Sequence, residues 1–191
     1  MAQGVSNFAR EHWEHDCGLV VGYDRRFGSE NFARTVCEVL AANGIKSYLT
    51  TEPTPTPAIA YMIPKLGAAG GLIITASHNP PSDNGIKIRT STGAAVAPEN
   101  LARIESAIPD NLAAVNCMPF DHAADQSLVE RVDLADPYLQ GVRDNFDLKR
   151  VATSGIRVVV DSMFGAGAGY MDQLLAGEAI QLVTIRQEHN P

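Results

Sequence analysis

Short apolar runs alternate with segments whose apolar residues recur at helical spacing. Continuous apolar runs are typical of strands that are buried on both faces of a sheet. Four runs that predict strands lie in the first half of the chain, at residues 18–23, 45–49, 70–74 and 86–88. The helical spacing is clearest in one apolar stripe, formed by Phe32, Val36, Val39 and Leu40. Further helices are predicted at 6–15, 59–66 and 101–108. This alternation predicts a three-layer α/β/α domain with a mixed, mostly parallel sheet.

Local signals place some of the element ends. Ser29 is predicted to cap the helix that follows the first turn, and Asn43 with Gly44 is predicted to end it. Residues 109–126 show no clear period and are interpreted as a connector. A helix is predicted over 132–146, with Leu139, Val142 and Phe146 on one face.

A second, shorter α/β pattern follows this helix. It consists of a strand at 156–160, a glycine- and alanine-rich stretch at 165–169, a helix through Leu174 and Leu175, and a strand at 180–185. A strand–helix–strand unit contains too little core to be a complete domain. We therefore expect a first domain over 1–147 and the incomplete beginning of a second α/β domain over 148–191.

Composition and charge exclude several classes of function. The chain has 191 residues, 45% of them hydrophobic, and a formal net charge of −7, which argues against a general binder of nucleic acid or anionic membranes. No apolar run approaches the roughly 18 residues of a membrane span, and the N-terminus lacks the apolar core of a signal peptide. The three cysteines, Cys17, Cys37 and Cys117, fit reduced thiols better than a disulfide framework. A cytoplasmic protein is expected.

The strongest candidate for chemistry is the polar loop at residues 75–85, which directly follows the apolar run 70–74. In open α/β sheets, ligands bind at the carboxyl ends of the strands. The loop contains the hydroxyl of Ser77 beside His78, and Lys87 follows shortly after. A hydroxyl that accepts a phosphoryl group needs a nearby cation and a fixed backbone. Composition alone favours the competing interpretation, a surface turn rich in serine, asparagine and proline.

The neighbouring charged residues also have simpler interpretations. Lys87 could be a solvated lysine at a strand end, and Arg26 could pair with Asp24 or Glu30. Arg25 is assigned to the surface. The histidines outside the loop lack the spacing of metal ligands and are assigned to the surface as well: His12, His15, His122 and His189.

Two other site classes are disfavoured. Ser77 does not lie in a G-x-S-x-G elbow, and the adjacent His78 is poorly placed to act as its base, which argues against a serine hydrolase. The stretch at 165–169 matches neither a P-loop nor G-x-G-x-x-G, so it is interpreted as close packing and a turn that opens the second unit.

Four motifs together resemble the α-D-phosphohexomutases, the family of phosphoglucomutase, phosphomannomutase and phosphoglucosamine mutase. The sequences ITASHNP at 74–80 and DNGIK at 83–87 resemble the phosphoserine loop of this family. VVGYDRR at 20–26, TPTP at 54–57 and VVVDSMFGAGAG at 158–169 resemble its first turn, its TP loop and the opening of its second domain. The order is that of the family, so the chain resembles domain I and the start of domain II.

The resemblance implies a role for each loop residue. Ser77 would be the phosphorylated serine, and Lys87 would act beside it in proton transfer or charge stabilisation. His78 would belong to the catalytic loop. Arg26 would offer its guanidinium fork to phosphate oxygens. Asn79 and Asn84 would support the phosphate and the substrate.

The resemblance also implies Mg²⁺, bound by a phosphate oxygen on Ser77 and by carboxylates that lie outside this chain, with a hexose 1,6-bisphosphate as activator. The implied activity is that of an isomerase of carbohydrate metabolism, which interconverts hexose 1- and 6-phosphates. Because the family's proteins are much longer, the chain is expected to be an N-terminal fragment. The alternative is a non-catalytic remnant or an interaction module.

The family's first strand, with its DGxRG-like signature, has no counterpart before Leu19. An open sheet edge is therefore expected, together with exposed apolar surface on the second unit. Both features favour self-association.

Overall fold

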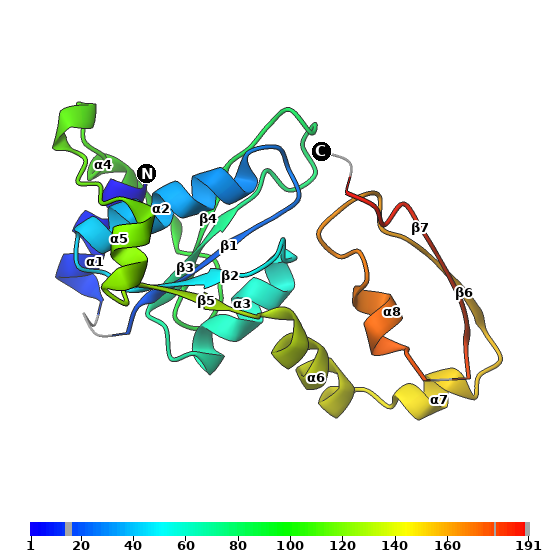
Figure 1. Ribbon diagram of the computed structural model, residues 1–191. Helices are drawn as coiled ribbons and strands as arrows, with labels where there is room; N and C mark the ends of the chain where they lie inside the picture. Colours follow the sequence, from blue (N-terminus) through cyan, green and yellow to red (C-terminus); the bar gives the residue numbers. More distant parts are fainter. Residues whose placement is uncertain (14–16, 178, 190–191) are drawn as a thin grey trace.

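A five-stranded sheet forms the centre of the computed structural model, which describes residues 1–13, 17–177 and 179–189 (Figure 1). The strands are β1 (Leu19–Tyr23), β2 (Ser47–Thr50), β3 (Gly70–Ile74), β4 (Ile86–Thr90) and β5 (Val129–Val132). They are arranged in the order β4-β3-β1-β2-β5. β1 pairs in parallel with β2 and β3, and β5 pairs in parallel with β2, whereas β4 is antiparallel to β3. The predicted mixed, mostly parallel sheet is confirmed.

Helices cover both faces of this sheet, as predicted for three layers. One face is covered by α1 (Ala2–His12), α2 (Ser29–Ala42), α4 (Pro98–Ser106) and α5 (Phe120–Asp125). The other is covered by α3 (Thr56–Lys65) and approached by α6 (Ala135–Asn145). β1 is the central strand of the sheet, and helices cover both of its faces. Val21 packs into the first layer and Val20 into the second, so every residue of β1 is buried, which explains its uniformly apolar sequence.

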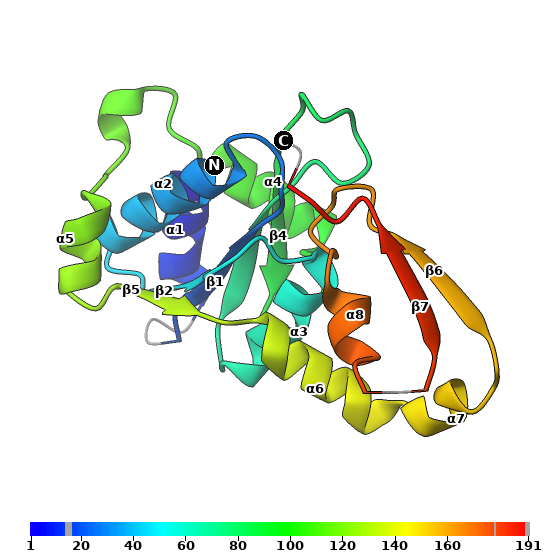
Figure 2. The ribbon, with the colours of Figure 1, turned by 45° about the vertical axis from the view of Figure 1, so that its right-hand side comes forward.

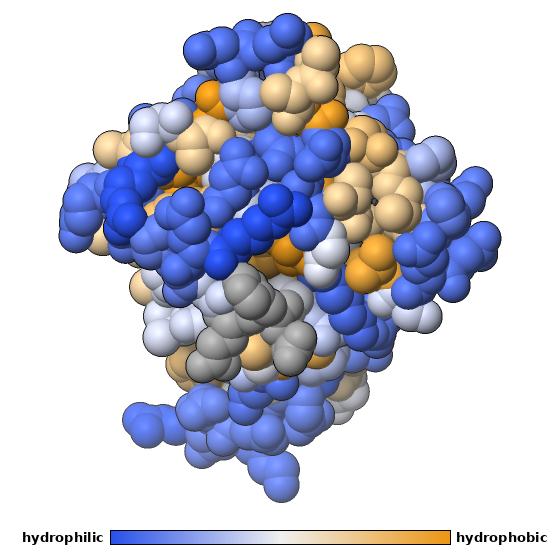
Figure 3. Space-filling view, turned by 90° about the vertical axis from the view of Figure 1, so that its left-hand side faces the viewer, coloured by the Kyte–Doolittle hydropathy of each residue, from blue (hydrophilic) through white to orange (hydrophobic). Residues whose placement is uncertain are grey.

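The inner side of the first layer is the larger core cluster. The end of the molecule where the central strands begin carries mostly hydrophilic residues with smaller apolar groups between them (Figure 3). A buried amide pair, Gln3 and Asn43, ties α1 to the end of α2 through bonds of 3.0 Å in both directions. None of the helices that the structure describes is long and apolar enough to cross a bilayer.

The second unit, residues 148–189 as far as they are described, lies beside the α/β/α layers (Figure 2). It contains α7 (Leu148–Ala152), β6 (Arg157–Asp161), α8 (Tyr170–Leu174) and β7 (Gln181–Ile185), and β6 pairs with β7 in parallel. As expected, it exposes apolar side chains: Ile156, Val159, Val183 and Ile185.

Several sequence predictions need correction. The connector predicted at 109–126 contains a short 3-10 helix, Leu112–Ala114, as well as α5, and β5 follows it. The helix predicted over 132–146 begins only at Ala135, because Val132 completes β5. The strand was missed because only Val129 of its four residues is buried, which leaves no apolar period to detect. The last two residues of the helix predicted at 6–15, Glu14 and His15, lie outside the described residues.

Three single residues also differ from prediction. Ser29 does not cap α2: Gly28, with φ of 75°, occupies that position, and the Ser29 hydroxyl donates to Asp24 Oδ1 at 2.8 Å. Phe32 belongs to the predicted apolar stripe and Phe146 to the predicted face with Leu139 and Val142, but their side chains are 51% and 65% exposed.

Candidate functional site

The carboxyl ends of β1, β2 and β3 meet at one edge of the sheet. The backbone N–H of Asp24 donates to the carbonyl of Ile74 at 3.1 Å, which joins the ends of β1 and β3. The N–H of Thr54 donates to the carbonyl of Tyr23 at 2.8 Å, which brings the TP loop (residues 54–57) to the same edge. The serine loop (residues 75–85) closes above it, with a bond of 2.9 Å from Thr75 N to the Gly85 carbonyl. Three segments far apart in sequence therefore surround one point.

Arg26 braces the serine loop from the turn after β1. Nη2 donates to the Ser77 and Asn79 carbonyls, each at 2.8 Å, and Nη1 donates to the Pro80 and Asp83 carbonyls at 2.6 and 3.1 Å. Nε lies 3.3 Å from Asp24 Oδ2, which is the ion pair weighed as the simpler alternative. A guanidinium has five N–H donors, and these contacts occupy its fork. In this structure Arg26 holds the main chain of the loop, and its expected role towards phosphate oxygens stays a prediction.

Ser77 combines an exposed side chain with an unusual backbone. Its φ of 60° lies in the left-handed region, which residues other than glycine seldom adopt. The Ser77 N–H donates to Thr75 Oγ1 at 3.0 Å, and its carbonyl accepts from Arg26. These bonds hold a conformation that costs on the order of 1–3 kcal/mol by itself. They present the hydroxyl to solvent.

Lys87 reaches the same hydroxyl from the neighbouring strand. Its Nζ donates to Ser77 Oγ at 3.0 Å. Lys87 lies on β4, opposite Ile73 of β3, so the hairpin of β3 and β4 fixes the position of its backbone. The structure thus brings together the two residues whose proximity the loop sequence suggested. A lysine at this distance can stabilise negative charge that develops on the oxygen.

The two asparagines act on the loop in different ways. Asn84 Nδ2 donates to Ser29 Oγ at 2.9 Å and to the Phe27 carbonyl at 3.4 Å, so Asn84 ties the loop to the start of α2. Asn79 contributes its backbone: its N–H donates to the Ala76 carbonyl at 3.1 Å and its carbonyl accepts from Arg26.

A cleft of about 810 Å³ opens beside Ser77. His78 and Asn79 line it on the side of the serine loop, and Phe27 lines it on the side of the first turn. The TP loop and residues 163–167 of the second unit complete the wall. A cleft that is lined by the Ser77 hydroxyl, by Arg25 and Arg26 and by polar side chains, at the carboxyl edge of a sheet, suits a small anionic substrate.

Comparison with known proteins adds the family. The family model described as phosphoglucomutase/phosphomannomutase, α/β/α domain I, matches residues 1–114. The chain belongs to this family. The match covers the five-stranded sheet up to β4 and includes the serine loop and Lys87.

Individual relatives carry several mutase names. Phosphoglucomutase of Staphylococcus haemolyticus is 28% identical over 200 residues, which cover 100% of this chain and 35% of the relative. Phosphoglucosamine mutase of Synechococcus sp. is 34% identical over 148 residues, covering 78% of this chain and 31% of the relative. Phosphoribomutase of Saccharomyces cerevisiae is 33% identical over 154 residues, covering 75% of this chain and 25% of the relative. This chain thus spans about a third of the length of the curated relatives that it matches.

Solved structures agree with the fold. A crystal structure of a "putative phosphomannomutase" from Thermus thermophilus superposes with a TM-score of 0.85 at 34% identity, covering 100% of this chain and 41% of that one. The likeness extends over the second unit, because the whole chain is covered.

Two features of this phosphohexomutase-family site were misjudged from sequence. Arg25, assigned to the surface, is half-buried, and its Nη1 donates to the Gln187 carbonyl of the second unit at 2.7 Å. Residues 165–167, interpreted as close packing and a turn, line the same cleft as Ser77. Contacts between segments this far apart in sequence leave no pattern in the neighbouring residues. The resemblance of residues 158–169 to the family's second-domain motif was the one signal that pointed to this segment.

The described residues do not form a magnesium site. Within residues 1–13, 17–177 and 179–189, no three side chains of histidine, cysteine, aspartate or glutamate gather around a common point. Mg²⁺ requires several oxygen ligands in octahedral geometry.

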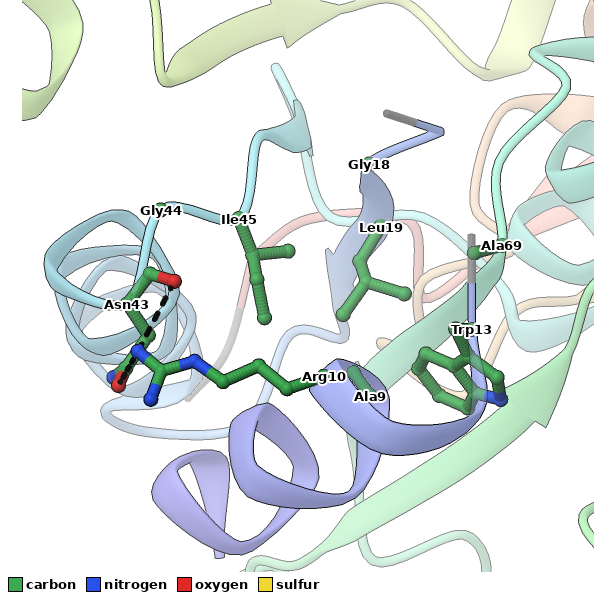
Figure 4. Close-up of a pocket in the computed structure, with 9 residues that line it drawn as sticks. All are labelled: Ala9, Arg10, Trp13, Gly18, Leu19, Asn43, Gly44, Ile45 and Ala69. Carbon is green, nitrogen blue, oxygen red and sulfur yellow. Dashed lines mark hydrogen bonds between the residues drawn. The ribbon is translucent and has the colours of Figure 1, made fainter. Parts of the chain in front are cut away.

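A smaller hollow of about 250 Å³ lies at the opposite edge of the sheet (Figure 4). Gly18 and Leu19, at the amino end of β1, line it together with Trp13. Arg10 spans its floor and donates to Asn43 Oδ1 at 2.9 Å. Among the described residues, no cysteine, serine or acidic side chain lines this hollow.

Proposed function

We propose that the chain carries the phosphoryl-accepting part of a phosphohexomutase that interconverts hexose 1- and 6-phosphates. One observation carries the proposal: Lys87 Nζ donates to Ser77 Oγ at 3.0 Å, on a loop whose backbone is held from outside. The family supports the reaction class, because its members named above are mutases. The hexose specificity and the phosphoserine route are part of the proposal.

The reaction at Ser77 transfers one phosphoryl group. A new bond forms between Ser77 Oγ and phosphorus while the bond between phosphorus and the sugar oxygen breaks. The proton of the serine hydroxyl ends on the released sugar oxygen. In the reverse direction Ser77 Oγ is the leaving group, and Lys87 stabilises its developing charge. The phosphoserine carries about −1.5 to −2 charges at pH 7. The adjacent ammonium group of Lys87 also stabilises this negative charge.

The loop's backbone supplies positioning. Phosphoryl transfer depends mainly on the placement of the reacting oxygen and on electrostatic stabilisation. Arg26 fixes four carbonyls of the loop, and Asn84 fixes its far end. In this proposal both are positioning residues, whereas Ser77 and Lys87 touch the reacting atoms.

We also propose the domain division suggested by the sequence, with domain I over 1–147 and the start of domain II from 148. The five-stranded sheet is complete at Val132, and β6 and β7 form a separate sheet, which supports this division. Figure 1 shows α6 leading from one to the other.

The test is to incubate the purified chain with glucose 1,6-bisphosphate and Mg²⁺, and to map phosphate by peptide mass spectrometry. Phosphate on Ser77, lost in Ser77→Ala and kept in Ser82→Ala, is the expected result. Ser82 is a matched control because it is an exposed serine of the same loop. Equal labelling of Ser77→Ala would contradict the assignment of the nucleophile. A folded chain that takes up no phosphate would favour the non-catalytic alternative.

A further inference from the structure

Phe27 is the most exposed phenylalanine among the large apolar side chains that the structure leaves at the surface. Its side chain is 83% exposed at the turn that follows β1. Single exposed apolar residues are common on proteins, so exposure alone assigns no role. The position of Phe27 in the molecule distinguishes it from the others.

Phe27 stands where two hollows adjoin. It lines the cleft of about 810 Å³ that contains Ser77, and also a hollow of about 700 Å³ that extends towards Glu52 and Arg131. Both share the turn residues 24–27. The other two exposed phenylalanines, Phe32 and Phe146, line neither hollow.

The backbone of Phe27 is held by the loop that carries the reactive hydroxyl. Its carbonyl accepts from Asn84 Nδ2 at 3.4 Å. Arg26, the residue before it, is bonded to four carbonyls of the serine loop. Gly28, the residue after it, adopts φ of 75° as the N-cap of α2. The main chain is therefore fixed relative to Ser77, while the aromatic ring stays open to solvent.

A sugar phosphate presents two kinds of surface to such a cleft. Its phosphate and hydroxyl groups suit the polar lining, which includes His78 and Asn79. The faces of its ring carry C–H groups, which pack favourably on the electron-rich face of an aromatic ring. Ligand sites typically combine an aromatic surface with a few placed polar groups.

We propose that Phe27 is a substrate-contacting residue whose ring packs against the C–H face of the sugar when a sugar phosphate occupies the cleft beside Ser77. The inference rests on the proposed function and adds a contact for the sugar part of the substrate. It predicts that Phe27 affects the binding of sugar phosphates but not that of phosphate alone.

The test uses the 191-residue chain with ¹³C-labelled phenylalanine, followed by NMR during titration with glucose 6-phosphate and, separately, with inorganic phosphate. The Phe27 signals are assigned by their loss in Phe27→Leu. We expect glucose 6-phosphate to shift them and inorganic phosphate to leave them in place. Phe27→Ala should raise the Kd for glucose 6-phosphate about 3- to 10-fold. Phe146→Ala, which removes another exposed ring, should leave it unchanged.

Phosphorylation of Ser77 by glucose 1,6-bisphosphate is measured in parallel, to separate this inference from the proposed function. If Ser77 is phosphorylated but the Phe27 signals do not respond to glucose 6-phosphate, the inference is wrong and the function stands. If the signals respond but Ser77 is never phosphorylated, the contact stands and the function is wrong. An equal loss of affinity for both probes in Phe27→Ala would also overturn the inference.

Discussion

The guanidinium of Arg26 donates to the main-chain carbonyl of Ser77 at 2.8 Å, across 51 positions of sequence. Three more carbonyls of the same loop accept from it. A single side chain thus braces four carbonyls of the loop that carries the proposed nucleophile. The arrangement separates two tasks, because Arg26 positions the loop while Lys87 faces the hydroxyl itself.

Arg26→Lys should reduce the phosphorylation of Ser77 by about tenfold or more, because one ammonium cannot serve four carbonyls in the way that a planar fork does. The rate is measured by mass spectrometry with glucose 1,6-bisphosphate as donor. Arg143→Lys is the matched control, since Arg143 donates to a single carbonyl, that of Gln173. Equal rates for Arg26→Lys and the wild type would show that the loop keeps its shape without this brace.

Lys87→Met should lower the same rate on the order of 10²-fold, because it removes the cation beside Ser77 Oγ. Lys87→Arg distinguishes the two roles that the family resemblance allows. An arginine keeps the charge but does not exchange its proton near neutral pH. We expect Lys87→Arg to retain more activity than Lys87→Met, because Nζ donates to the serine oxygen. Equal losses would indicate proton transfer instead.

The sequence was sufficient for the centre of the fold and for the pair at the reactive loop. β1 and β3 are continuous apolar runs because helices cover both of their faces, so their pattern is unambiguous. Ser77 and Lys87 lie ten positions apart around one hairpin, which makes their proximity a local property. Local information is reliable where the partners are near in sequence or the burial is complete.

The remaining features depend on contacts between distant segments. The edge strand β5 carries Glu130 and Arg131 in its centre and buries only Val129, so no period marks it. Arg26 contacts a loop that lies more than 50 positions further along the chain, so its role cannot be recognised from its own neighbours in sequence. Residues 163–167 line the cleft beside Ser77 only because the second unit lies next to the serine loop. Helical spacing includes Phe32 in the predicted apolar stripe, but the first buried apolar residue of α2 is Ala33.

Gly93 should tolerate alanine far less well than Gly44. Both have positive φ, of 81° and 74°. A Cβ at Gly44 would meet no atom within 4 Å, whereas one at Gly93 would overlap the Ala60 carbonyl oxygen of α3. We expect Gly44→Ala to lower the free energy of unfolding by about 1 kcal/mol and Gly93→Ala by about 2–4 kcal/mol. Urea unfolding measures both. Similar losses would show that the turn after β4 moves away from α3 at little cost.

Alkaline pH should destabilise the protein through Cys37. Burial raises the pKa of this thiol from 9.0 to about 12. Above pH 9 the unfolded chain releases the thiol proton, but the folded chain keeps it until about pH 12. The free energy of unfolding is therefore unaffected by this group below about pH 9 and falls between about pH 9 and 12, by at most about 1.4 kcal/mol per pH unit.

The window from pH 9 to 10 shows this effect best. Tyr23 and Tyr170 ordinarily titrate near pH 10 and burial raises their pKa values to about 12, so they contribute less in this window than at higher pH. Urea unfolding at several pH values in this window should show a shallower decline for Cys37→Ala than for the wild type. Cys117→Ala is the control: partial burial and the nearby Glu38 also raise the pKa of this thiol, but Cys117 is exposed, so we expect it to account for a smaller share of the decline. Parallel curves for the wild type and Cys37→Ala would mean that the thiol near α2's centre already ionises in the folded protein, so that water reaches the core beneath β2.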